Sequence, residues 1–453
     1  MTDLTERQPD LVRIETPWGE FPAVESDGIV RLRNIRYARA DRFEPPKPVD
    51  PDPDESADLQ YTTLACPQPP SASAEVLGDP LTGARFDEDC LRLTITRPAE
   101  VDGPLPVLVC IHGGAYVSNA GDLPGFNPSA LVREHGLIVV SVTYRLGLLG
   151  FIGDDARQRH SANLGLLDVI EALRWVRDHI AGFGGDPDAV TVSGHSSGGD
   201  AIAHVLVAEG TEGLIRRAII QSAPFGIRRR RDAMHEKMRD AIGELRSDAS
   251  YDDLFAAQAR AKHAGSRFGL RSGMSFCTEY GHAPLPAEAD IDATWRRRAP
   301  GLEVLVTWTT DETMFYLNQV PRARAFFGTP VIGPLARRVA VAVSSNAVYA
   351  RGGRRFGRLL ARSGATVYEG VFDGHPASGA LGAAHAMDVT LLFPNEDAWA
   401  RSALVGTDAA RSLTTAGVGL RAAFAGFVRT GRVSVSKVEL GSGWLGGLQI
   451  RRR

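Results

Sequence analysis

Two continuous apolar runs, at residues 105–112 (LPVLVCIH) and 137–144 (LIVVSVTY), constrain the fold of this chain most strongly. A strand that is buried on both faces has an unbroken apolar sequence, whereas a strand with one wet face alternates. A helix with one apolar stripe is predicted over 163–183, and a further β-branched strand over 190–193. Strands that alternate with helices predict an α/β fold with a mostly parallel central sheet and helices on both faces.

The rest of the chain is organised around this central part. Alternating residues within 10–45 predict a small antiparallel β region at the N-terminus, and the Pro-, Asp- and Ser-rich stretch 44–80 predicts surface loops. Residues 225–300 are helical and irregular, and we expect them to line a pocket. Length alone suggests about three domains, but enclosed α/β folds exceed that rule. We therefore expect residues 1–453 to form a single domain.

Composition and charge exclude several classes of function. The chain is 43% apolar and 23% charged with a net charge of -3, so it lacks the basic footprint of nucleic-acid binding. The longest apolar stretch, 136–153, is interrupted by Tyr144 and Arg145 and predicts no membrane span. The polar N-terminus has no secretory apolar core, and we expect a cytoplasmic protein. Four cysteines without C-x-x-C spacing predict no zinc site, and we expect no metal or organic cofactor.

A glycine-rich turn stands between the strand at 190–193 and the helix that follows it. Gly194-His195-Ser196-Ser197-Gly198 matches G-x-S-x-G, the strand-to-helix turn that presents a nucleophilic serine, here Ser196. Its position at a helix N-terminus favours developing negative charge. The alternative is a turn that needs glycine only for packing. His195 is a poor candidate base, because neighbours on a strained turn point apart and a base must come within about 2.6–3.2 Å.

A second glycine turn, IHGGAY at 111–116, directly follows the buried strand 105–112. Glycines there expose backbone N–H groups without side-chain obstruction, as the second half of an oxyanion hole requires. Two glycine turns of this kind, each directly after a strand, rarely arise by chance. Together they favour an active site for acyl transfer.

The sequence resembles the type-B carboxylesterase/cholinesterase family of α/β-hydrolases. The resemblance covers most of residues 10–225 in order and parts of 300–430, and its most specific block is 163–199. The middle of the chain is shorter than is usual in that family. The stretches that carry the resemblance are RNIRYARADRFEPPKPV, EDCLRLTITRP, PVLVCIHGGAYVS, VTYRLGLLGF, NLGLLDVIEALRWVRDHIAGFGGDPDAVTVSGHSSGG, RRAIIQSA, TWTTDETMFY and LGAAHAMDVTLLF.

The resemblance implies a catalytic triad. The nucleophile falls on Ser196, the acid on Glu312 in TTDET and the base on His385 in LGAAHAMD. The chain order Ser, Glu, His agrees with that of α/β-hydrolases. Asp311, which is adjacent to the acid, and His375, ten residues before the base, are the competing candidates.

The resemblance also implies an oxyanion hole made by the backbone N–H groups of Gly114, Ala115 and Ser197. Ala115 stands where a third glycine is commoner, and we expect its methyl group to narrow the space beside the scissile carbonyl. His195 replaces the acidic residue that usually precedes the nucleophile, and the tryptophan of the choline site is missing, so a cholinesterase is disfavoured. Asp388 replaces the commoner glutamate after the catalytic histidine.

Two further features of the sequence remain open. Cys66 and Cys90 match the cysteines that close a disulfide loop in secreted members of the family, so we expect the two thiols to lie close together. A reducing cytoplasm argues against oxidation. The run at 228–231 (RRRR) is interpreted as solvated surface, although Arg228 follows QSAPFG closely enough to bind an anionic substrate.

The leading interpretation is a carboxylic ester hydrolase that acts on a small-molecule substrate through an acyl-enzyme intermediate. A hydrolase or transferase for another acyl bond (an amide, a carbamate or a biosynthetic ester) uses the same machinery and is the alternative. A non-catalytic interaction protein on the same fold is the third possibility, and it is disfavoured because all three triad positions hold competent residue types.

Overall fold

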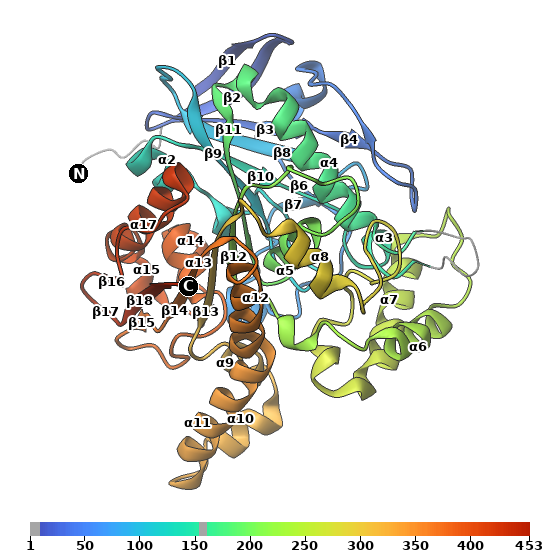
Figure 1. The fold of residues 1–453 in the computed structure, drawn as a ribbon, viewed down its shortest axis with the longest axis vertical. Helices are drawn as coiled ribbons and strands as arrows, with labels where there is room; N and C mark the ends of the chain where they lie inside the picture. The colour runs from blue at the N-terminus through green and yellow to red at the C-terminus, as the bar shows by residue number, and fades with distance from the viewer. Residues whose placement is uncertain (1–9, 154–160) are drawn as a thin grey trace, which may run out of the picture.

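A 12-stranded sheet organises the computed structural model, which describes residues 10–153 and 161–453 (Figure 1). The strand order is β1-β2-β3-β8-β10-β9-β11-β12-β13-β14-β18-β16. The six strands from β10 to β14 are parallel: β10 (Ile138–Val142), β9 (Leu105–Ile111), β11 (Gly185–His195), β12 (Arg217–Gln221), β13 (Glu303–Thr309) and β14 (Thr366–Phe372). The polar N-terminal segment 1–9 lies outside the described residues.

Antiparallel strands extend the sheet at both ends. One end carries β1 (Asp10–Thr16), β2 (Gly19–Ser26), β3 (Ile29–Arg36) and β8 (Arg92–Pro98), and the other carries β18 (Gly447–Arg452) and β16 (Lys437–Glu439). The predicted N-terminal antiparallel region is therefore present. Three two-stranded sheets lie apart: β4 (Ala38–Arg39) with β5 (Lys47–Pro48), β6 (Thr63–Ala65) with β7 (Ala84–Phe86), and β15 (His375–Pro376) with β17 (Trp444–Leu445).

The central strands bury both faces, as their unbroken apolar sequence predicts. Val107 and Val109 belong to one core cluster, whereas Leu108 between them belongs to the other, because successive side chains of a strand point to opposite faces. The first cluster packs under α4 (Leu164–His179), α5 (Ser197–Val205) and α12 (Arg351–Ala361). The second packs under α2 (Ser129–His135), α13 (Met387–Leu392) and α17 (Val418–Thr430).

The regions that the sequence left irregular are built from short elements. The stretch 44–80, expected to be loops, holds β5, β6, η1 (Asp54–Leu59) and α1 (Ala74–Leu77), so that expectation is wrong in detail. Residues 225–300 are helical, as expected: η5 (Phe225–Ile227), α6 (Asp232–Ile242), α7 (Tyr251–Gly265), η6 (Ser266–Met274) and α8 (Ile291–Arg298). The other short helices are η2 (Pro124–Phe126), α3 (Gly147–Gly150), η4 (Ile180–Phe183), α14 (Glu396–Ala400), α15 (Thr407–Ala410) and α16 (Leu413–Ala416).

One helical segment projects from the rest of the molecule at the lower end of Figure 1. It contains α10 (Pro321–Phe327) and α11 (Ile332–Ser345), follows α9 (Met314–Leu317), and returns through a π-helical turn, η7 (Asn346–Ala350), into α12. Within the described ranges, none of the helices combines the length and the apolarity needed to cross a lipid bilayer.

Candidate active site

The parallel strands bring the candidate residues to one edge of the sheet. The glycine turn 113–116 follows β9, Ser196 follows β11, and Glu312 follows β13 by three residues. Since the carboxyl ends of neighbouring parallel strands meet at the same edge, these three segments converge. His385 reaches the same place from the loop between β15 and α13.

Ser196 occupies a strained turn between β11 and α5. Its backbone has φ 58° and ψ -124°, a conformation that a residue with a side chain rarely adopts. Its N–H donates to the carbonyl of Gln221 on β12 at 2.8 Å. The turn has no spare room: a Cβ on Gly198 would lie 2.1 Å from the carbonyl oxygen of Ile111, and one on Gly113 would lie 3.1 Å from the Cβ of Ser196. Gly198 of G-x-S-x-G is thus required by the close approach of β9, and Gly194 by that of the first turn of α5, where an added Cβ would lie 2.5 Å from the carbonyl carbon of Gly198.

Glu312 and His385 are in direct contact. His385 Nδ1 lies 2.5 Å from Glu312 Oε2, while Glu312 Oε1 accepts the backbone N–H of Thr309 at 2.9 Å. Because a carboxylate can only accept, this bond assigns the ring proton to Nδ1 and leaves a lone pair on Nε2. Both side chains are buried, and His385 Nε2 has no partner among the described protein groups. Ser196 and His385 line the same cavity.

The competing residues have other partners. Asp311 accepts the backbone N–H of Ala383 at 3.2 Å and so holds the loop that leads to the histidine. His375 lies in β15, where its Nδ1 is 2.9 Å from the carbonyl oxygen of Pro376, and it does not line the cavity that contains Ser196. The geometry therefore favours Glu312 and His385 over both competitors.

His195 and Asp388 flank the candidate base. The ring of His195 packs against that of His385 with centroids 4.5 Å apart, and burial, followed by the charge of His385, holds the pKa of His195 well below its usual value. A neutral ring in that place adds no charge beside the base. Asp388 accepts from Gln221 Nε2 at 2.8 Å, and burial raises its pKa to about 6.

The turn after β9 presents unpaired backbone donors. Gly114 and Ala115 have φ of 120° and 54°, which turn the chain back sharply over Ser196. None of the N–H groups of Gly114, Ala115 and Ser197 donates to another group in the part of the chain that the structure describes. The Ser197 hydroxyl instead accepts the N–H of Tyr116 at 3.3 Å and ties the two turns together.

The cavity beside Ser196 has two lobes, of about 320 Å³ and 270 Å³. Ser196, Ala115 and Tyr316 line both, so the candidate nucleophile lies where the lobes meet. The first lobe is walled by Phe126, Phe276, Phe315, Val389 and Trp399, and the second by Ile227, Leu270, Met274, Leu317 and Val348. The stretch 225–300 contributes to both walls. A substrate with two apolar parts joined by a carbonyl group fits this arrangement.

Comparisons with known proteins place the chain in a family. A family model described as "Carboxylesterase family" matches residues 23–323. A Rhodococcus erythropolis protein described as "Probable N-octanoylanthranilate hydrolase" is 35% identical over 435 residues, 93% of each chain. The chain belongs to the carboxylesterase family.

Other relatives are the phenmedipham hydrolase of Pseudarthrobacter oxydans, 30% identical over 404 residues (81% of this chain and 79% of that one), and the para-nitrobenzyl esterase of Bacillus subtilis, 38% identical over 215 residues (46% and 43%). A solved thermophilic PNB esterase has a TM-score of 0.74 at 24% identity and covers 97% of both chains. The resemblance inferred from the sequence is confirmed, and the carboxylesterase-family chain has the α/β-hydrolase fold.

Aromatic rings around the base were missed by sequence reasoning. Tyr316 and Tyr349 pack against His385 with centroid distances of 5.6 Å and 5.1 Å, and the Tyr349 hydroxyl donates to that of Tyr316 at 3.2 Å. Burial raises the pKa of Tyr316 to about 12, although the hydroxyls of Tyr349 and Ser196 act against it. Tyr316 lies on the short helix α9, four residues after Glu312, and this nearness to the acid in the sequence was the signal that could have identified it. Tyr349 lies on the π-helical turn, and no local pattern marks it.

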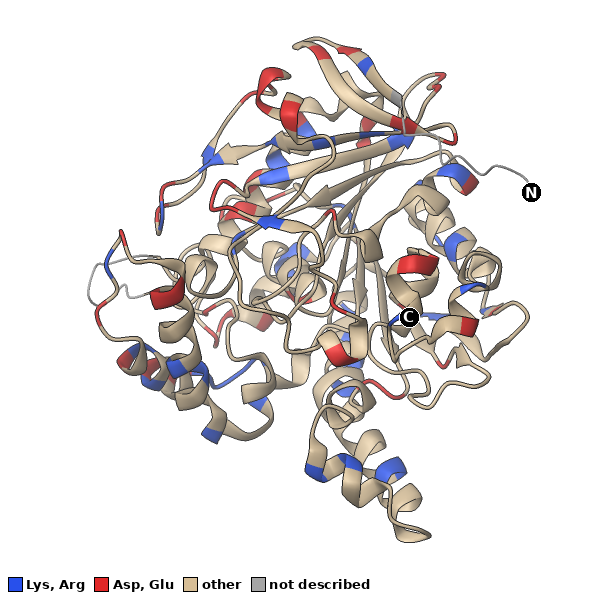
Figure 2. Ribbon diagram, turned by 180° about the vertical axis from the view of Figure 1, so that it is seen from behind, with Lys and Arg blue, Asp and Glu red and all other residues tan. Residues whose placement is uncertain are grey.

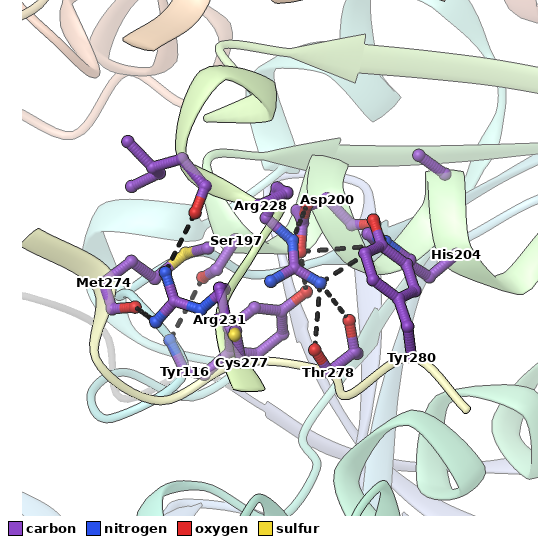
Figure 3. Close-up of polar contacts among 12 residues, drawn as sticks. Tyr116, Ser197, Asp200, His204, Arg228, Arg231, Met274, Cys277, Thr278 and Tyr280 are labelled. Carbon is purple, nitrogen blue, oxygen red and sulfur yellow. Dashed lines mark hydrogen bonds and ion pairs between the residues drawn. The ribbon is translucent and has the colours of Figure 1, made fainter. Parts of the chain in front are cut away.

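The interpretation of residues 228–231 as solvated surface is wrong for two of its members. Arg228 is buried, with Nε 2.7 Å from Asp200 Oδ1 and Nη2 3.0 Å from the carbonyl of Thr278 (Figure 3). The other oxygen of Asp200 accepts the Tyr116 hydroxyl at 2.7 Å. Arg228 lines neither lobe, so the geometry does not support its binding of an anionic substrate.

Arg231 is buried as well and fixes one wall of the cavity. Its Nη2 donates to the carbonyls of Met274 and Ser275 at 2.6 Å and 3.0 Å, and these two residues line the second and the first lobe respectively. Arg228 therefore ties the segment that follows η6 to the helix that begins after Ser196, and Arg231 ties the end of η6 to η5.

Cys66 and Cys90 are buried free thiols in the structure. The hydrogen bond between them is the main reason that the pKa of Cys90 lies well above its usual value, so the expected proximity is present. Cys66 Sγ also accepts the backbone N–H of Leu146 at 3.3 Å. The disulfide stays a prediction.

Gly198→Ala tests the crowding of the turn. The added Cβ meets the Ile111 carbonyl at 2.1 Å, so we expect a loss of about 3 kcal/mol or more in the free energy of unfolding. Gly426→Ala is the matched control, since Gly426 is inside α17 with no atom within 4 Å of the position that the added methyl group would take, and it should be neutral or stabilising by up to about 1 kcal/mol. Urea unfolding measures both, and equal effects would contradict the steric argument.

Asp388→Asn tests the cost of the buried carboxylate. Burial raises the pKa of Asp388 from 3.8 to about 6 in the folded protein. Ionised Asp388 therefore lowers the free energy of unfolding, fully above pH 6, and this loss disappears below pH 3.8, where the group is protonated in both the folded and the unfolded states. We expect the variant to be more stable than wild type at pH 8, by about 3 kcal/mol at most. The difference should shrink as the pH falls through 6. Urea midpoints at pH 8 and pH 5 measure it, and a pH-independent difference would contradict the assignment.

Proposed function

We propose that this protein is a serine hydrolase that cleaves carboxylic esters through an acyl-enzyme intermediate. Ser196 is the nucleophile, His385 the general base and acid, and Glu312 the residue that orients the imidazole. The N–H groups of Gly114, Ala115 and Ser197 are the oxyanion donors in this proposal, with Tyr316 bordering the site.

The reaction follows from these roles. As the Ser196 oxygen attacks the carbonyl carbon, His385 Nε2 takes the hydroxyl proton, and Glu312 stabilises the resulting imidazolium. The carbonyl oxygen gains negative charge and is held by the backbone donors. Nε2 then returns the proton to the leaving alcohol, and the C–O bond breaks to give the acyl-enzyme. Water repeats the sequence, releases the acid and restores Ser196.

The observation that carries the proposal is the 2.5 Å contact between Glu312 and His385, which leaves an unpartnered Nε2 beside the cavity that Ser196 lines. A buried imidazole with one nitrogen bound to a carboxylate and the other free is the arrangement that general-base catalysis needs. Membership of the carboxylesterase family supports the same reaction class.

Hydrolysis of an N-acyl aromatic amide is a second candidate. The relative that covers 93% of this chain is described as acting on N-octanoylanthranilate, which joins an alkyl chain and an aromatic acid through an amide. The second lobe is apolar and suits the alkyl chain, and the first is rich in aromatic rings. Among the described residues that line the two lobes, Lys262 is the one Lys, Arg, Asp or Glu, and its ammonium group could pair with a carboxylate.

A matched panel of p-nitrophenyl esters and p-nitroanilides of rising acyl length tests both candidates. We expect wild type to hydrolyse the esters, and Ser196→Ala and His385→Ala to lose about 10³-fold or more in kcat. His375→Gln is the control histidine variant and should keep full activity.

The pattern of loss distinguishes the remaining hypotheses. Ester hydrolysis that survives Ser196→Ala would place the nucleophile elsewhere. Anilide turnover comparable to ester turnover would favour the amide candidate. Inactivity of folded wild type on every compound would favour a non-catalytic interaction protein.

Ala115→Gly tests the space beside the scissile carbonyl. The methyl group of Ala115 lies where the lobes meet, and its φ of 54° suits glycine, so its removal should widen the site without backbone strain. We expect kcat/KM to rise for esters of bulky tertiary alcohols relative to primary ones. An unchanged ratio of the two would refute this role.

A further inference from the structure

The helical hairpin at residues 320–345, which contains α10 and α11, turns its apolar side chains toward solvent. Ile332, Leu335, Val339 and Val343 lie three or four residues apart on α11 and are 67%, 66%, 56% and 65% exposed. The opposite face of α11 buries Val341 and Ser345, so one valine on this helix is buried while the four larger or equal apolar side chains of the stripe face solvent. A surface helix of a globular protein normally directs its apolar stripe to the core, so this orientation is reversed.

The tip of the hairpin extends the same apolar surface. Val331, at the turn between the helices, is 88% exposed, and Phe326 at the end of α10 is 52% exposed. Figure 1 shows both helices standing clear of the sheet, with no other element over them. Contiguous exposed apolar surface of this kind marks a site of interaction.

The charge of the hairpin has one sign. It carries Arg322, Arg324, Arg337 and Arg338, and no Asp or Glu occurs anywhere in residues 313–368. Figure 2 shows only blue segments on these two helices, at the bottom of the view. The whole chain has a net charge of -3, so positive charge is concentrated here against the overall balance.

We propose that the hairpin docks on the surface of an anionic lipid bilayer. An amphipathic helix with apolar side chains on one side and arginines around them binds in the plane of such an interface, where the apolar groups enter the headgroup region and the guanidinium groups pair with lipid phosphates. The aliphatic part of an arginine side chain can lie along an apolar surface while its guanidinium group reaches a phosphate. The apolar contact and the charged contact can therefore form together.

A second copy of this chain is a poorer occupant of the same surface. Two hairpins packed through their apolar stripes would bring eight guanidinium groups together, with no carboxylate within either segment to compensate. An anionic bilayer supplies the missing negative charge as well as the apolar environment.

The base of the hairpin borders the second lobe of the cavity, so docking would change what that lobe faces. Leu317 and Ser344, at the two ends of the hairpin's base, line the second lobe together with Leu270, which is itself 59% exposed. The apolar rim of that lobe therefore continues toward the hairpin. Docking would turn the second lobe toward the lipid, where apolar acyl compounds accumulate.

Co-sedimentation of the full-length protein with vesicles tests the proposal without an activity measurement. We expect binding to vesicles of phosphatidylcholine mixed with phosphatidylglycerol, weaker binding to phosphatidylcholine alone, and loss of binding as salt is added. Arg337→Gln/Arg338→Gln should lower the partition coefficient roughly 30-fold, and Leu335→Ser/Val339→Ser about tenfold or more.

Matched control variants place the same changes elsewhere on the surface. Leu11→Ser/Leu445→Ser removes two apolar side chains that are 60% and 52% exposed, and Arg13→Gln/Arg246→Gln removes two arginines whose side chains are 69% and 81% exposed. Both controls should bind vesicles as wild type does. All four variants should hydrolyse a water-soluble ester at the wild-type rate, because none of the altered residues lines the cavity.

Three results would overturn the proposal. The first is equal binding to neutral and anionic vesicles, or no binding to either. The second is the same loss of binding in the control variants as in the hairpin variants. The third is a combination of two observations: wild type does not bind vesicles, and analytical ultracentrifugation detects a dimer that Leu335→Ser/Val339→Ser dissociates. That result would make a second copy of the chain the occupant of the hairpin surface.

Discussion

The backbone at Ser196 is held in a conformation that costs about 1–3 kcal/mol for a residue with a side chain. Such strain persists only where the surroundings leave no alternative. Here the N–H of Ser196 is bound to β12, and the glycine turn after β9 packs against the serine from the other side. The position of the hydroxyl is therefore set by the spacing of three adjacent parallel strands, and the cavity, the donor groups and the candidate base are all arranged around that point.

A buried ion pair fixes the helix that begins at this turn. Asp200, on the first turn of α5, is fully buried and shared between Arg228 and Tyr116. A buried ion pair is weak evidence for stability, because desolvation offsets most of the attraction. It does specify geometry, since each partner would be left as an uncompensated charge if the elements shifted. The pair therefore holds the segment that walls the cavity in a defined place relative to the nucleophile.

The parts of the fold and site that depend on local pattern could be predicted from the sequence. Unbroken apolar strands and glycine spacing predicted the sheet and the turn at Ser196, and the family resemblance pointed to Glu312 and His385, which lie in contact in the structure. Ion pairs between residues far apart in the chain could not be predicted from local sequence pattern. An arginine run is normally solvated, and nothing near Arg228 indicates that Asp200 and Thr278 will meet it in the interior. The hairpin has no distinguishing mark in the sequence, because an apolar stripe at helical spacing looks the same whether it faces the core or the solvent.

The charge around the candidate base bears on which substrates the proposed reaction would accept. In the proposed mechanism His385 becomes an imidazolium in contact with the Glu312 carboxylate, while burial holds the pKa of the neighbouring His195 ring well below its usual value. Tyr316 and Tyr349 offer hydroxyl groups without charge, since burial raises the pKa of both. Neither lobe is lined by a carboxylate among the described residues, so no side chain there would form a salt bridge with a cation. In the proposed reaction, a lining without carboxylates suits neutral and anionic acyl compounds, and it repels neither of them.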